Sequence, residues 1–153
     1  WVYLMIGDCH MAADRPREAR QAYREATRID ADDPRIWMAL AKASLACDDP
    51  AEAASAARKA MARGGDAVEA TLVQACAALA RGDAAGAAKL VDRVLKQRPD
   101  DPTALCMMGR CRAAQGHVEE AVGFYTRALR ADPNRPLARQ LMASAMRARE
   151  GGR

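Results

Sequence analysis

The side chains that could carry out covalent or metal chemistry in this chain are those of five cysteines and two histidines. Cys9 and His10 are sequence neighbours, and such a pair can supply a nucleophile with its base or two ligands for a metal ion. Adjacent side chains on a helix point about 100° apart, so these two do not converge on one atom. Cys106 and Cys111 are five residues apart, also a poor spacing for shared ligation, and His117 stands alone in a predicted turn. We therefore predict no catalytic residue, no metal site and no cofactor, and we expect the chain not to be an enzyme.

The cysteine count is odd, and no two cysteines have the CxxC spacing of a redox or metal motif. Thiols packed as small apolar groups in a reducing compartment fit this pattern better than disulfides do. The sequence has no apolar stretch long enough for a membrane span and no secretory leader at its start. We expect a cytoplasmic protein. Because the chain opens on what resembles mid-helix sequence, we also expect a piece of a longer protein, with room for an upstream targeting signal.

The elements that carry these side chains are predicted to be helices. Aromatic residues make up only 4% of the chain, and strong helix formers such as Ala, Leu, Met and Arg dominate it. The 24 basic and 20 acidic residues are interspersed and give a net charge of +4. A nucleic-acid surface would concentrate its basic residues and interleave them with stacking aromatics. We therefore predict neither nucleic-acid binding nor membrane insertion.

A period of 34 residues runs through the chain. Similar blocks begin at Asp14, Asp48, Gly82 and Gly116, without a slip over three intervals. A unit of this length is typical of two antiparallel helices, which bury their apolar faces only by stacking on neighbouring units. Three columns keep the period: Gly7, Ala41, Ala75 and Gly109; Tyr23, Ala57, Val91 and Tyr125; and Ala26, Ala60, Val94 and Ala128. We expect the small residues of the first column to face Ala19, Ala53, Ala87 and Ala121 of the second helices.

The period predicts nine helices, at residues 2–13, 17–30, 34–47, 51–63, 67–80, 84–97, 102–115, 118–131 and 135–149. Their capping residues are predicted to include Asp33, Asp66, Asp101 and Asn134. We expect one array over residues 1–149, with repeats at about 1–33, 34–67, 68–101 and 102–135. The helix at 135–149 caps the array or, alternatively, is half of a truncated repeat. Residues 150–153 are expected to form a frayed tail.

These columns resemble the tetratricopeptide repeat family. The fourth unit matches the family pattern best, through residues that include Leu105, Gly109, Ala121, Tyr125 and Ala128, and the third unit matches it least. The resemblance implies an all-α solenoid of stacked antiparallel helix pairs. It also implies a right-handed superhelix of four 34-residue repeats and one C-terminal helix.

The resemblance further implies that the first helix of each pair lines a concave groove. The side chains that it places there are mostly aliphatic or sulfur-containing, with isolated charges, and methionine suits surfaces that accept varied apolar ligands. An alternative is that the Met and Leu side chains simply pack between helices. One subclass of the family clamps a C-terminal carboxylate, and the residues at the matching positions here do not form that clamp. The predicted partner-binding residues are Leu4, Asp8, Met11, Arg35, Met38, Lys42, Leu45, Glu69, Leu72, Cys76, Leu79, Cys106, Met107 and Arg110.

The sequence therefore predicts a non-catalytic interaction module that binds a peptide or partner protein in an apolar concave groove. Two alternatives remain open. The array could be an oligomerisation or assembly scaffold, including a homo-oligomer. It could also be the adaptor domain of a larger enzyme whose catalytic part lies outside this sequence.

Overall fold

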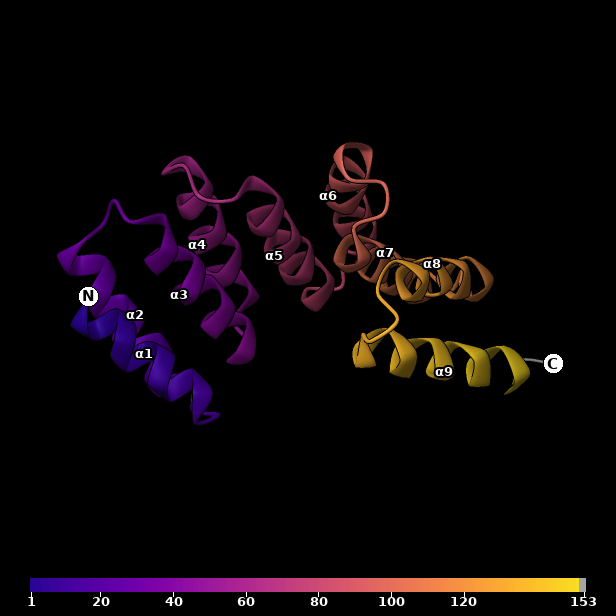
Figure 1. Cartoon of the computed structure of the whole chain (residues 1–153), viewed down its shortest axis with the longest axis horizontal. Helices are drawn as coiled ribbons and strands as arrows, with labels where there is room; N and C mark the ends of the chain where they lie inside the picture. Colours follow the sequence, from indigo (N-terminus) through magenta and orange to yellow (C-terminus); the bar gives the residue numbers. More distant parts are fainter. Residues whose placement is uncertain (152–153) are drawn as a thin grey trace. The chain divides into compact units, whose positions relative to one another are not determined.

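The computed structural model describes residues 1–151, which form nine α-helices and no strand within that range (Figure 1). Within residues 1–81 and within residues 82–151, helices that are neighbours in sequence pack on one another, so the predicted all-α class of stacked helices is confirmed. The helices are α1 (Val2–Ala12), α2 (Pro16–Ile29), α3 (Pro34–Ala46), α4 (Pro50–Ala62), α5 (Ala67–Ala80), α6 (Ala84–Gln97), α7 (Pro102–Ala114), α8 (Val118–Ala131) and α9 (Pro136–Gly151).

Each predicted helix is present, and its ends agree with the structure to within two residues. The largest difference is at α9, which continues through Gly151. Of the predicted frayed tail, residues 152 and 153 lie outside the described residues.

The chain divides into two compact units, Trp1–Arg81 and Gly82–Arg153. In the first unit each helix from α1 to α5 packs on the next, and α3 also contacts α5. In the second unit α6 packs on α7, α7 on α8 and α8 on α9, and α7 also contacts α9. The boundary falls inside the third predicted repeat, and a single array of four repeats stays a prediction.

Aspartate side chains cap most of the helices. Asp33 accepts a hydrogen bond from the backbone N–H of Arg35 at 2.8 Å, and Asp66 and Asp101 cap α5 and α7 in the same way, as predicted. Asp49 and Asp83 cap α4 and α6, which the sequence analysis did not predict. The predicted cap at Asn134 is not matched, because α9 begins two residues later, at Pro136. Each cap satisfies a backbone donor that the helix itself leaves unpaired.

The column that marks the start of each repeat block has a left-handed backbone. The φ angles are 55° at Asp14, 58° at Asp48, 81° at Gly82 and 83° at Gly116. These residues lie in the turn between the two helices of each predicted repeat, where the chain must reverse direction. Glycine takes this conformation at no steric cost, and aspartate tolerates it better than most residues do. The backbone therefore explains why only these two residue types occupy the column.

Two hairpins share a close approach of an aromatic ring to a glycine. A Cβ added to Gly7 would lie 2.3 Å from the ring of Tyr23, and one added to Gly109 would lie 2.4 Å from the ring of Tyr125. The atoms nearest to a Cβ at these glycines therefore belong to the tyrosine rings. That Ala19 and Ala121 face the glycines stays a prediction. Both rings are buried, so a methyl group at either glycine would overpack the contact.

Two glycines of the second unit test the role of the left-handed turn. Gly116→Ala should lower the free energy of unfolding by about 1 kcal/mol, because an alanine at φ 83° is strained although the space around it is empty. Gly123→Ala is the matched control. Gly123 is an exposed position inside α8, also with empty space around it, so alanine there should raise the free energy of unfolding by about 0.5–1 kcal/mol. Urea unfolding measures both changes, and a shift of the same sign in both variants would refute the assignment.

Candidate functional site

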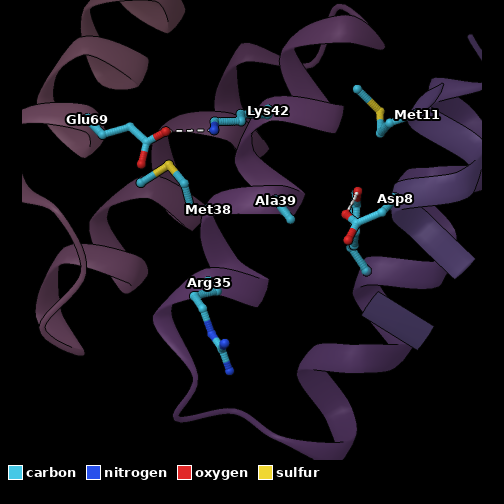
Figure 2. Close-up of a pocket in the computed structure, with 8 residues that line it drawn as sticks. Asp8, Met11, Arg35, Met38, Ala39, Lys42 and Glu69 are labelled. Atoms are coloured by element: carbon cyan, nitrogen blue, oxygen red, sulfur yellow. Dashed lines mark hydrogen bonds and ion pairs between the residues drawn. The ribbon is translucent and has the colours of Figure 1, made fainter. Parts of the chain in front are cut away.

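A cavity of about 380 Å³ opens in the first unit among α1, α2, α3 and α5 (Figure 2). Most of its lining consists of predicted partner-binding residues. Figure 2 shows Asp8 and Met11 opposite Ala39 and Met38, with the Lys42–Glu69 pair at one edge. The residues that line the cavity are Asp8, Met11, Tyr23, Arg35, Met38, Ala39, Lys42 and Glu69.

Tyr23 and Asp8 form a polar contact in the lining of the cavity. The Tyr23 hydroxyl donates a hydrogen bond of 2.8 Å to Asp8 Oδ1. Only 2% of Tyr23 is exposed, and burial together with the hydrogen bond raises the pKa of its phenol above the usual value. The phenol therefore stays neutral and orients the carboxylate without cancelling its charge. The sequence analysis had placed Tyr23 in a column of the 34-residue period but not at the binding surface.

The other charged groups of the cavity are already paired. Lys42 Nζ lies 2.6 Å from Glu69 Oε1, an ion pair that joins α3 to α5. Arg35 Nη2 lies 2.6 Å from Asp33 Oδ2, and the pKa of Asp33 is lowered by that hydrogen bond. The guanidinium of Arg35 also stacks 4.7 Å from the centre of the Trp1 ring. These pairs are partly or largely exposed, so solvent screens them and they contribute little to stability.

The apolar part of the lining comes from Met11, Met38 and Ala39. Met38 belongs to the core of the first unit with 7% of its surface exposed, and Met11 and Ala39 pack on that core while staying half-buried. The cavity thus has a floor continuous with the hydrophobic core and a charged rim. Pockets that combine an apolar wall with a few placed polar groups are the usual form of a ligand site.

The remaining predicted partner-binding residues do not line this cavity. Leu4 and Leu45 are half-buried against the core of the first unit, and α5 carries the half-buried Leu72, Cys76 and Leu79. In the second unit, 3% of Cys106 and 6% of Met107 are exposed, and Arg110 is half-buried. For Met38, Cys106 and Met107, this burial agrees with the alternative that these side chains pack between helices.

Within residues 1–151, no group of three His, Cys, Asp or Glu side chains is placed to hold a metal ion. None of the described helices combines the length and the hydropathy that a membrane-spanning helix needs.

Two family models, both described as tetratricopeptide repeat, match the sequence. One covers residues 78–145 and the other residues 1–43. No curated protein matches the sequence.

Solved structures of repeat proteins share the fold at low sequence identity. TTC0263, a tetratricopeptide protein of Thermus thermophilus, is 18% identical with a TM-score of 0.84, and the match covers 95% of this chain and 80% of that one. MamA of Desulfovibrio magneticus RS-1 is 17% identical with a TM-score of 0.75, covering 97% of this chain and 84% of that one. YrrB, a tetratricopeptide protein with an unusual peptide-binding site, is 16% identical with a TM-score of 0.66. The match covers 97% of this chain and 76% of that one.

The contact between Tyr23 and Asp8 can be tested with a pair of matched substitutions. Tyr23→Phe should lower the free energy of unfolding by about 1 kcal/mol, because it removes a hydrogen bond to a charged acceptor. Tyr125→Phe should change it by less than about 0.5 kcal/mol, since the Tyr125 hydroxyl has no hydrogen-bond partner among residues 1–151. Denaturant unfolding at neutral pH measures both, and equal losses would contradict the role of the hydrogen bond.

Tyr23 and Tyr125 should also make the free energy of unfolding depend on pH. Burial raises the pKa of both phenols, that of Tyr125 to about 12. An unfolded tyrosine ionises near pH 10, so the wild-type chain should lose stability as the pH rises above 10 and the unfolded state releases its protons first. Each Phe variant should lose less over that range than the wild type does.

Proposed function

The chain belongs to the tetratricopeptide repeat family, and we propose that it is a non-catalytic interaction module. The cavity of the first unit would bind a peptide or an exposed segment of a partner protein. The observation that carries this proposal is the convergence of predicted partner-binding side chains from three separate first helices on one cavity. The peptide-binding site of YrrB, which shares the fold, supports the same class of ligand.

The chemistry of the lining suits such a ligand. Two methionines present flexible and polarizable surface, which adapts to varied apolar side chains. Charged groups at the rim restrict the orientation in which a segment can enter. Leu72 and Leu79 of α5 remain part of the predicted binding surface, and we propose that they extend it beyond the cavity within the first unit. Arg110 of the second unit stays a separate prediction.

A charge reversal at the rim tests the proposal. Lys42→Glu breaks the ion pair with Glu69 and reverses a charge at the rim, so the affinity for the partner should change at least about tenfold, rising for a basic segment and falling for an acidic one. The free energy of unfolding should change by no more than about 1 kcal/mol, because Lys42 is exposed. Binding is measured by photo-crosslinking from a group placed at Met11, followed by titration of the partner identified in this way.

Arg58→Glu provides the control for this test. Arg58 is exposed on α4 of the same unit and does not line the cavity. Its substitution by Glu changes the charge by the same amount as Lys42→Glu does. This variant should bind as the wild type does. If Lys42→Glu leaves the affinity unchanged, or if both variants change it equally, the cavity is not the binding site.

A second candidate function, assembly with other copies, is favoured by the surface of α1. Val2 is 69% exposed and Met5 is 63% exposed, and with Ile6 they border an apolar pocket of about 390 Å³. One period further on, the residues matching Val2 and Ile6 are Ile36 and Leu40, each of which is only 3% exposed. The chain thus buries in α3 the face that it leaves open in α1, and another copy could cover that face.

Light scattering over a concentration series tests the assembly hypothesis. The apparent mass of the wild type should rise with concentration, and Met5→Glu should abolish the rise by putting a charge on the apolar face. Ile29→Glu is the matched control, since Ile29 is 70% exposed on α2 and should leave the association unchanged. A wild type that stays monomeric at every concentration would exclude assembly through this face.

A further inference from the structure

The charges around the cavity of the first unit do not balance. Lys42 is paired with Glu69, and Arg35 is paired with Asp33, each at 2.6 Å. Asp8 has no ion pair among residues 1–151, and its hydrogen-bond partner is the neutral hydroxyl of Tyr23. The one carboxylate of this lining left without a cation within residues 1–151 therefore faces an open cavity.

Asp8 is also held in place. Tyr23 is nearly fully buried, its ring lies against Gly7, and its hydroxyl holds Asp8 Oδ1 at 2.8 Å. The second carboxylate oxygen, Oδ2, is the side of Asp8 not engaged by the phenol. A carboxylate that is already oriented loses little freedom when it accepts a cation, which favours binding.

The walls next to Asp8 are apolar. Met11 lies one turn further along α1, and Figure 2 shows Ala39 of α3 across from Asp8, with Met38 beyond it toward Glu69. Lysine and arginine side chains combine an aliphatic stem with a charged head, and they bury the stem along apolar surface when the head can reach a polar partner. The cavity of about 380 Å³ has room for such a side chain together with part of an apolar neighbour.

An acidic ligand fits the same cavity less well. It would have to displace Glu69 from Lys42, or Asp33 from Arg35, and both of those contacts are already at 2.6 Å. It would also bring a negative charge close to Asp8, which like-charge repulsion disfavours. A basic ligand needs no existing pair to be broken.

From these observations we infer that the cavity recognises a partner segment through one Lys or Arg side chain next to an apolar residue. The cation pairs with Asp8, and the stem packs on Met11 and Met38. This inference rests on the proposed function, because it names the ligand class of the same cavity.

Selection from a random-peptide display library on the whole chain tests the inference. Peptides selected by the wild type should be enriched at least about threefold in Lys or Arg beside an apolar residue. For the best of them, a synthetic peptide with norleucine in place of the basic residue should bind at least about tenfold more weakly by fluorescence anisotropy. The affinity of the basic peptide should also fall as salt is raised.

Two variants of the chain separate the role of Asp8 from general charge. Asp8→Asn keeps an oxygen that can accept from Tyr23 but removes the charge, so the preference for the basic peptide over the norleucine peptide should fall to within about twofold. Asp14→Asn removes the same charge at an exposed turn of the same unit and should keep the full preference. Circular dichroism shows whether each variant is folded. If Asp8→Asn does not fold, the peptide pair on the wild type and its salt dependence decide the question.

The outcomes distinguish this inference from the proposed function. Selected peptides without a basic preference, or a preference that Asp8→Asn leaves intact, overturn the inference. If the affinity of such peptides still changes in Lys42→Glu but not in Arg58→Glu, the proposed function stands. If the wild type enriches no peptide at all, binding of a peptide in the cavity is refuted, and the inference is refuted with it.

Discussion

The first hairpin depends on how closely its two helices approach at Gly7. Because Gly7 has no Cβ, the ring of Tyr23 lies directly on α1. That contact buries the ring and brings the phenol oxygen within 2.8 Å of Asp8, the residue after Gly7. One packing constraint therefore fixes the helix pair and also orients the charged group that faces the cavity. A larger residue at position 7 would disturb both.

The fourth predicted repeat uses the same packing with a different charge. Tyr125 lies on Gly109 as Tyr23 lies on Gly7, but the residue that follows Gly109 is Arg110. A guanidinium has only donors, so it cannot accept from a phenol as a carboxylate does. The repeat thus supplies a constant backbone and a variable side chain next to the glycine.

Local features were predictable because local forces decide them. The 34-residue period located every helix of residues 1–151, and aspartates before a helix identified the caps at Asp33, Asp66 and Asp101. The caps at Asp49 and Asp83 follow the same rule, but each directly follows a residue of the turn column, Asp48 or Gly82, and was not predicted as a cap. The left-handed backbone of that column is visible in the sequence only as its restriction to Asp and Gly. The contact of Tyr23 with Gly7 joins residues of two different helices, and no local sequence pattern shows which residue of α2 touches the glycine of α1.

The sequence by itself determined that the chain is helical, that it repeats, and which side chains lie on the first helix of each pair. These properties follow from propensity and periodicity, which act within a few residues. Only the tertiary structure decided which of those side chains remain open to a ligand. Asp8, Met11 and Lys42 border a cavity, whereas Cys106 and Met107, predicted for the same surface, are buried. Exposure depends on the helices that pack against a residue, and those helices come from distant parts of the chain.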